Sequence, residues 1–197
     1  MSRRTRLAYI QSLLNSIGNI RLFRIPLLSD QIFELFCYFR KLEEFINRGK
    51  TPICVSKRAG YFSPHLRPGY ARSADYFRLA DPLGGEVREL ILNGQFIGDS
   101  GVYHSPDIVL AESDENRIVS IYECKNYSGT IGPGTYREFI GYCKETGLLS
   151  KANQVRINGL IGTFPELAPS IFTSGAVNQS QADKMKRKYN FNVFDNL

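Results

Sequence analysis

The sequence predicts an α/β fold in which a mixed β-sheet is flanked by helices. From residue 86 onward, three extended segments are joined by connections too short for crossovers, which indicates antiparallel strands. The chain then alternates helical and extended segments, a pattern typical of parallel pairing. Apolar residues make up 43% of the 197 residues, which is enough for a core and too many for a disordered chain.

Residues 1–29 are expected to form a helical arm, with a short helix over 6–17. The chain begins with basic residues and a short apolar run, as a signal peptide does, but Gln11, Asn15 and Asn19 interrupt the run and no small-residue cleavage site follows. No stretch approaches the ~20 apolar residues of a membrane helix. We therefore predict an amphipathic helix in a cytoplasmic protein that does not enter a membrane.

The clearest helix is "QIFELFCYFRKLEEFINRG", residues 31–49. Its apolar residues recur at i, i+3, i+4 and i+7, Ser29 or Asp30 is suited to cap its start, and Gly49 is suited to end it. Residues 50–82 mix basic, aromatic, glycine and proline residues without a period, so we expect long loops there with one strand at most.

The remaining elements follow from turn and capping signals. Asn93-Gly94 marks a turn or bulge in the first strand, and Thr135 with Glu138 forms a capping box that Gly147 would close as a helix stop. The predicted strands are 86–97, about 106–111, about 117–125, 169–175 and 191–196, and the predicted helices are 135–145, 150–162 and 180–190.

Charge and cysteine content limit the functional classes. The net charge is +6, and residues 1–80 carry 14 Lys and Arg against 5 Asp and Glu (+9), which leaves −3 for the rest and suggests a polyanionic partner. The four cysteines lack the close spacing of a zinc site. Cys37, Cys124 and Cys143 lie in apolar segments, so buried free thiols in a reducing compartment are expected.

Acidic and basic residues interrupt the two central strands in "HSPDIVLAESDENRIVSIYECK", residues 104–125. Because side chains alternate along a strand, Glu123 and Lys125 share one face with Val119 and Ile121. A carboxylate and an ammonium group are therefore expected side by side at the end of a core strand.

The hairpin brings a second carboxylate to the same place. Its turn places Asp107 opposite Tyr122, or opposite Glu123 if the turn changes by one residue, with Cβ atoms of neighbouring strands roughly 5 Å apart. Two carboxylates so close repel, and one should stay protonated unless a cation lies between them. A hard divalent ion such as Mg²⁺ binds one or two carboxylates with water and phosphate oxygens, and Lys125 could then hold the phosphate or orient the attacking water.

This arrangement resembles the PD-(D/E)XK nuclease superfamily. The motif here reads Pro106-Asp107, a gap of 15 residues, and Glu123-Cys124-Lys125. The predicted order of elements over residues 30–197 is similar to the restriction-endonuclease-like and Holliday-junction-resolvase-like branches, with a basic, aromatic-rich insertion at about 50–82. The resemblance implies a Mg²⁺-dependent endonuclease or exonuclease, with Mn²⁺ as an alternative ion and DNA as the favoured substrate.

The resemblance also implies the roles of individual residues. The segment "IFELFCYFRKLEEF" is similar to the leading helix of such nucleases, which makes Glu34 the third acidic ligand, although periodicity alone favours Glu43 as the more buried residue. The implied catalytic residues are Glu34, Asp107, Glu123 and Lys125. The implied metal ligands are Glu34, Asp107, Glu123 and the Cys124 carbonyl.

Five basic residues are candidates for contacts to nucleic acid. Interleaved basic and aromatic residues in 56–78 suit phosphate contacts with base stacking, but an ordinary loop that packs its aromatic residues on the core would look the same. A basic residue at the start of the helix after the motif could contact a phosphate. The five candidates are Lys57, Arg58, Arg67, Arg72 and Arg137.

Other interpretations stay open. The chain could be a catalytically silent binding module, or a scaffold subunit of a prokaryotic defence system whose activity needs a partner. A homodimer or a larger defence complex is compatible with the sequence. His104, three residues before Asp107, is expected to face solvent in a loop rather than act as a base.

Overall fold

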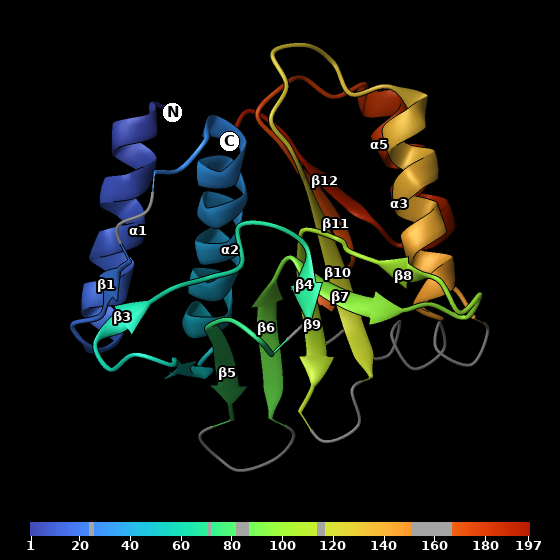
Figure 1. Cartoon of the computed structure of the whole chain (residues 1–197). Helices are drawn as coiled ribbons and strands as arrows, with labels where there is room; N and C mark the ends of the chain where they lie inside the picture. Colours follow the sequence, from blue (N-terminus) through green and yellow to red (C-terminus); the bar gives the residue numbers. More distant parts are fainter. Residues whose placement is uncertain (24–25, 71, 82–86, 114–116, 151–166) are drawn as a thin grey trace.

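The protein has three layers, with a central β-sheet between two pairs of helices (Figure 1). The computed structural model describes residues 1–23, 26–70, 72–81, 87–113, 117–150 and 167–197. The pair α1 (Arg3–Gly18) and α2 (Ser29–Asn47) covers one face, and α3 (Pro133–Glu145) and α5 (Gln179–Tyr189) cover the other. This arrangement confirms the predicted α/β class with a mixed sheet, whereas the helix predicted over 150–162 lies outside the described residues. Within these ranges, no helix combines the length and apolarity needed to cross a membrane.

The main sheet has seven strands in the order β12-β11-β10-β9-β6-β5-β2. Strands β10, β11 and β12 pair in parallel, and the other neighbouring pairs are antiparallel. The antiparallel pairing of β6, β9 and β10 is the one that the connection lengths predict. The strands are β2 (Thr51–Val55), β5 (Tyr76–Ala80), β6 (Arg88–Leu92), β9 (Ile108–Glu112), β10 (Ile118–Lys125), β11 (Ser170–Thr173) and β12 (Asn192–Phe194).

The prediction of long loops over residues 50–82 is wrong. This region supplies β2 and β5, which extend the main sheet at one edge. Phe62 and Phe77 are fully buried and stack on each other with ring centroids 5.1 Å apart. These rings are core residues and are not available to stack on bases. Short strands complete the region and its neighbours, namely β1 (Arg21–Leu22), β3 (Tyr61–Phe62), β4 (Gly69–Tyr70), β7 (Gly94–Ile97) and β8 (Tyr103–His104).

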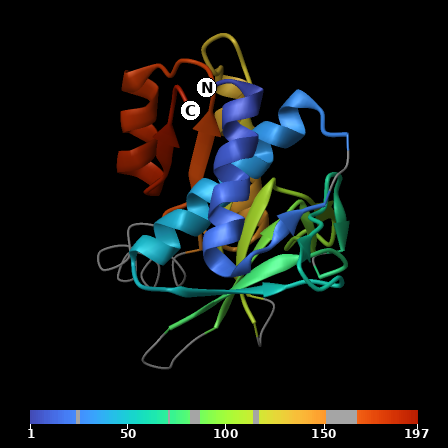
Figure 2. The same ribbon diagram turned by 90° about the vertical axis from the view of Figure 1, so that its left-hand side faces the viewer.

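Helix α2 is apolar on most of its circumference because it packs between the sheet and α1 (Figure 2). Phe39 is fully buried and packs edge-on against Phe62 and Phe77. Leu28 precedes the helix, so the prediction that Ser29 or Asp30 is the cap is wrong by one or two residues. Gly49 has a positive φ of 83°, which suits its predicted place after the helix.

Helix α3 begins two residues before the predicted start. Gly132 is the cap residue and Pro133 is the first helical residue, where the fixed φ of proline fits the helix and its missing N–H is not needed. The predicted capping box of Thr135 and Glu138 is therefore wrong, and Glu138 can contact the site described below. Gly147 has a φ of 68° just after the helix and confirms the predicted stop.

The loop between β10 and α3 is held against the chain that follows β11. The amide of Ala176 donates to the Gly129 carbonyl over 3.1 Å, and the amide of Ile131 donates to the Ala176 carbonyl over 3.2 Å. A Cβ atom on Gly175 would lie 2.1 Å from the Gly129 carbonyl oxygen. Glycine at 175 is therefore required by the close approach of two backbone segments.

We expect Gly175→Ala to destabilise the protein by roughly 1–3 kcal/mol, since backbone must shift to admit the methyl group. For a chain of this size, that corresponds to a fall in melting temperature of roughly 2–12 °C in a thermal denaturation experiment. Gly129→Ala is the matched control, because a Cβ atom there meets no atom within 4 Å. Equal melting temperatures for the two variants would contradict the proposed contact.

Candidate active site

Three polar residues lie in one row across neighbouring strands at the end of β6, the start of β9 and the end of β10. Leu92 pairs with Ile108, and Ile108 pairs with Tyr122, so the next position outward holds Asn93, Asp107 and Glu123. The amide of Asn93 donates to the Asp107 carbonyl over 2.7 Å. Of the two registers that the sequence allowed, the structure has the one that places Asp107 beside Glu123.

A β-bulge near the hairpin turn explains this register. Glu112 and Arg117 face each other at the turn, but the pairing shifts by one residue between Ile118 and Ser120. The bulge also moves Val119 into the core on the α2 face, so the prediction that Val119 shares a face with Glu123 is wrong. The extra residue is therefore what aligns the two carboxylates of the motif.

Asp107 is held by the strand beside it. Its Oδ2 accepts a hydrogen bond from the Cys124 amide over 2.6 Å. Burial raises the pKa of Asp107 well above its usual value, and the negative charges of Glu123 and Glu34 raise it further, against the opposing effects of the Cys124 amide and Lys125. Asp107 therefore lies in a buried environment with excess negative charge.

Glu123 and Lys125 form a close ion pair on one face of β10. Lys125 Nζ donates to Glu123 Oε1 over 2.7 Å, and the two side chains are only 17% and 4% exposed. Glu123 Oε2 is also buried and has no hydrogen bond of ordinary geometry. The nearby Asp107 amide acts to lower the pKa of Glu123, as the smallest of several effects. Burial raises the pKa of Glu123 in spite of the lysine. A buried carboxylate oxygen without a partner costs free energy and needs an explanation.

The ammonium group of Lys125 is surrounded by acidic groups. Burial alone would lower the pKa of Lys125, but the adjacent Glu123 carboxylate, with further contributions from Glu138 and Asp107, raises it overall. Lys125 Nζ lies 3.4 Å from Glu138 Oε2 on α3. Lys125 therefore stays protonated at neutral pH and can stabilise negative charge, but it cannot act as a general base.

Glu34 reaches the site from α2. Its Oε2 accepts a hydrogen bond from Asn93 Nδ2 over 3.1 Å. Burial raises the pKa of Glu34, and its charge acts on Asp107, which brings it into the same electrostatic group. Glu43 lies elsewhere, because its Oε2 accepts from the Tyr9 hydroxyl over 2.7 Å.

Cys124 contributes its backbone amide and carbonyl to the site rather than its thiol. Its thiol is buried on the α2 face near Cys37, and burial raises its pKa. The N–H and C=O of a strand residue point to the same neighbouring strand, so the Cys124 carbonyl points, like its amide, towards Asp107. The structure confirms that Cys37, Cys124 and Cys143 are buried and unbonded, whereas Cys54 is half-buried.

Helix α3 adds two residues that sequence reasoning did not assign to the site. The Tyr142 hydroxyl donates to Glu138 Oε1 over 3.4 Å. Burial and the charges of Glu123 and Glu138 raise the pKa of Tyr142 to about 12, so its proton is retained. The i, i+4 spacing of Glu138 and Tyr142 was the available signal.

His104 does not face solvent as predicted. It lies in β8, where its ring stacks on Phe96 with centroids 5.6 Å apart and meets Tyr142 edge-on at 5.9 Å. Its Nε2 lies 3.5 Å from Glu145 Oε2. Tyr142 and Glu145 come from a distant helix, so no local sequence pattern reveals them.

Among the residues that the structure describes, no three side chains of His, Cys, Asp or Glu converge as a ready-made metal cage. Each acidic residue of the site has a protein partner: Asn93 for Glu34, the Cys124 amide for Asp107 and Lys125 for Glu123. The site nevertheless suits one cation between Asp107 and Glu123, because Oε2 of Glu123 is buried and unpartnered and both pKa values are raised. Mg²⁺ needs only one or two protein carboxylates, with water and phosphate oxygens completing its shell.

The five predicted nucleic-acid contacts are spread over the molecule. Arg67 is exposed and lies two residues after His65, whose carbonyl accepts from Asn93 Nδ2 over 3.3 Å. Arg58 lies over the Tyr61 ring at 4.5 Å, in a hollow of about 870 Å³ that α1 also lines. Lys57 is exposed and donates to the Ser73 carbonyl. Of the five, Arg67 follows a segment that contacts Asn93 of the site, and Arg137 is considered separately below.

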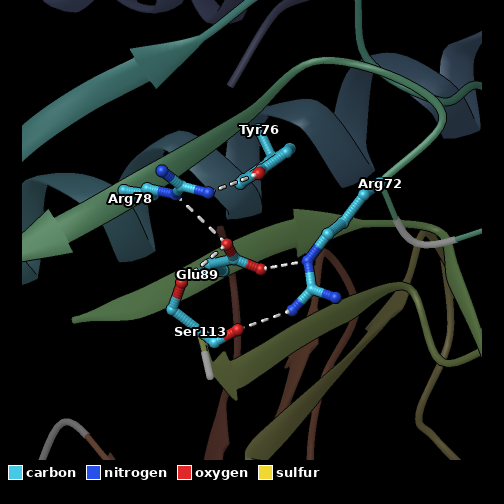
Figure 3. Close-up of polar contacts among 5 residues, drawn as sticks. All are labelled: Arg72, Tyr76, Arg78, Glu89 and Ser113. Carbon is cyan, nitrogen blue, oxygen red and sulfur yellow. Dashed lines mark hydrogen bonds and ion pairs between the residues drawn. The ribbon is translucent and has the colours of Figure 1, made fainter. Parts of the chain in front are cut away.

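Arg72 is engaged in an ion cluster around the buried Glu89 (Figure 3). Its Nε donates to Glu89 Oε2 over 2.6 Å, while Arg78 Nε and Ser113 Oγ donate to Glu89 Oε1 over 3.2 Å and 3.1 Å. Glu89 is fully buried, so two guanidinium groups and a hydroxyl stabilise its charge. A role for Arg72 in nucleic-acid binding would have to compete with this structural contact.

The chain matches no family model, and neither the curated proteins nor the solved structures include one that is significantly similar to it. The resemblance to PD-(D/E)XK nucleases therefore depends on the motif and its geometry alone.

Proposed function

We propose that the protein is a metal-dependent nuclease with a restriction-endonuclease-like fold, and that DNA is its preferred substrate. The observation that carries the proposal is the buried, unpartnered Oε2 of Glu123 beside Asp107, with an ammonium group 2.7 Å from the other oxygen of Glu123. If both groups are ionised, two unit charges at the roughly 5 Å spacing of neighbouring strands repel by about 3 kcal/mol at an effective dielectric constant near 20. A divalent cation between the two carboxylates would relieve this repulsion.

Asp107 and Glu123 would hold the ion, with the Cys124 carbonyl and Glu34 as further ligands. When bound, Mg²⁺ would lower the pKa of a water molecule and stabilise charge at the scissile phosphate. Lys125, which remains protonated, would neutralise charge that develops on the phosphate in the transition state. Tyr142 and Glu138 would position Lys125, since Glu138 contacts both of them.

The proposal is tested by incubating the protein with plasmid DNA, single-stranded DNA and RNA in Mg²⁺, Mn²⁺ or EDTA. We expect cleavage of DNA in either metal and none in EDTA, because without the ion nothing activates the water molecule. Equal cleavage in EDTA, or no cleavage of any substrate in either metal, would contradict the proposal.

A catalytically silent nucleic-acid-binding or scaffold subunit is the second candidate. It is favoured by the absence of a three-residue ligand cage among the described residues and by the pairing of Glu123 with Lys125. It predicts binding of nucleic acid that is the same in Mg²⁺ and in EDTA, with no product. Membership of a larger complex would then be tested by the oligomeric state of the purified chain.

A further inference from the structure

A basic hollow lies between α3 and α5, on the far side of α3 from Glu138. Its volume is about 420 Å³. The described residues that line it are Pro133, Tyr136, Arg137, Ile140, Gln181, Lys184 and Met185, and none of them is acidic.

Arg137 and Lys184 are two exposed cations that face one hollow. Lys125 and Arg72 are paired with Glu123 and Glu89, but neither Arg137 nor Lys184 forms an ion pair or hydrogen bond with another described residue. Two like charges that face one hollow repel each other unless an anion binds between them. The hollow therefore carries positive charge that none of its described lining residues balances.

Tyr136 provides independent support for a ligand. It is only 3% exposed, it lines the hollow, and its hydroxyl is buried without a hydrogen-bond partner in the structure. Buried hydroxyl groups are nearly always hydrogen-bonded, so this hydroxyl lacks an acceptor that the described residues do not supply. A guanidinium group, an ammonium group and a phenol are a donor set typical of phosphate contacts.

We propose that this hollow binds a backbone phosphate of a nucleic-acid strand whose scissile phosphate lies at Lys125. The inference rests on the proposed function, because the strand must pass both sites. Arg137 is adjacent in sequence to Glu138, which contacts Lys125, so the two sites lie on different faces of the first turns of α3. A helix with its side chains is about 10–12 Å across, and the phosphates of one strand of a duplex advance about 3.4 Å along the helix axis. Along a duplex, the phosphate in the hollow is therefore about three nucleotides from the cut.

The test measures binding of fluorescein-labelled single-stranded DNA of about 16 nucleotides to the full chain in EDTA. The double variant Arg137→Gln/Lys184→Gln is expected to bind about tenfold more weakly, and the slope of log affinity against log salt should shrink by about 0.7, as for one lost phosphate contact. Tyr136→Phe should weaken binding about threefold while keeping the ring. Lys186→Gln removes one charge from the opposite face of α5 and should bind like the wild type.

Length and phosphate source are tested in the same assay. A dinucleotide is too short to reach the hollow from Lys125, so the wild type and the double variant should bind it equally. Equal affinity of the double variant and Lys186→Gln for the longer strand would overturn the inference. Binding of inorganic phosphate that needs Arg137 and Lys184, without any binding of the strand, would also overturn it and indicate a free phosphate as the ligand.

Failure of the nuclease proposal gives a different result. If no substrate is cleaved in Mg²⁺ but the double variant loses strand binding in EDTA, the hollow is confirmed as a strand contact and only the catalytic assignment fails. If cleavage depends on the metal and the double variant binds the strand as tightly as Lys186→Gln does, the catalytic assignment stands and the hollow does not contact the strand.

Discussion

Asp107→Asn is expected to lower metal-dependent cleavage at least about 10³-fold while the protein stays folded. The side chain would lose the charge that holds the ion, and the several kcal/mol that a metal contributes to the transition state correspond to about three factors of ten in rate. Asparagine keeps an oxygen that can accept the Cys124 amide, so the local backbone contact is retained. Initial rates of plasmid cleavage in Mg²⁺ measure the effect.

The same variant should be at least as stable as the wild type in EDTA. The pKa of Asp107 is raised on folding, so its contribution to stability is fully present below the unfolded value near 3.9 and is lost as the pH rises through the folded value. The neutral amide of the variant would carry no such loss, and its advantage in melting temperature should be greatest near neutral pH and vanish towards about pH 4. Wild-type cleavage rates, or a clear fall in stability at neutral pH, would exclude the proposed repulsion.

Binding of the ion can be measured without activity. Mg²⁺ should raise the melting temperature of the wild type and have little effect on Asp107→Asn, because a ligand that binds only the folded state stabilises it. An equal rise in both proteins would mean that the ion binds elsewhere.

The order of strands around the site could be predicted because each signal is local. Short connections force antiparallel pairing of β6, β9 and β10, and helical connections allow parallel pairing of β11 and β12. The row of Asp107 and Glu123 was within one residue of its true register. The bulge between Ile118 and Ser120 decided it, and bulges depend on tertiary fit rather than on local sequence.

Strands β2 and β5, at one end of the sheet, were missed for a different reason. β2 is paired on one side only, so its residues are exposed or half-buried without an apolar period, and β5 contains Arg78, whose charge is matched by Glu89 on the next strand. An exposed arginine that pairs across strands interrupts the apolar pattern by which a core strand is recognised. The position of His104 was predicted wrongly because its partner Glu145 lies far along the chain, on α3.

The failed capping box of Thr135 and Glu138 has a functional consequence. Proline at position 133 sets the start of the helix, so Glu138 is left in the second turn, where Lys125 attracts it. A motif that reads as local capping thus became part of the site through a tertiary ion pair. Local sequence cannot distinguish the two roles, because both use the same carboxylate.

Lys125→Met is expected to separate the role of the ammonium group in chemistry from its role in folding. In EDTA it leaves Glu123 buried without its partner, which should cost about 3–5 kcal/mol, or about 10 °C in melting temperature for a chain of this size. Mg²⁺ should then raise the melting temperature more than it does in the wild type, since the ion replaces the ammonium group as the counter-charge of Glu123. Cleavage should still fall about 10²-fold or more, because the bound ion does not supply the charge of Lys125 at the phosphate.

A catalytic lysine is distinguished from a structural one by two results together: Mg²⁺ raises the melting temperature of the variant more than that of the wild type, and cleavage is still lost. If Lys125 only neutralised Glu123, the ion would take over that task, and the variant in Mg²⁺ would recover both stability and activity. Lys186→Met is the matched control, because Lys186 is exposed on α5 and forms no ion pair with the described residues. Its melting temperature should change little in either condition, as is usual for an exposed surface substitution. If Lys125 stabilises the transition state, the cleavage rate of the variant must therefore stay low even in Mg²⁺, where the ion has restored the stability of the fold.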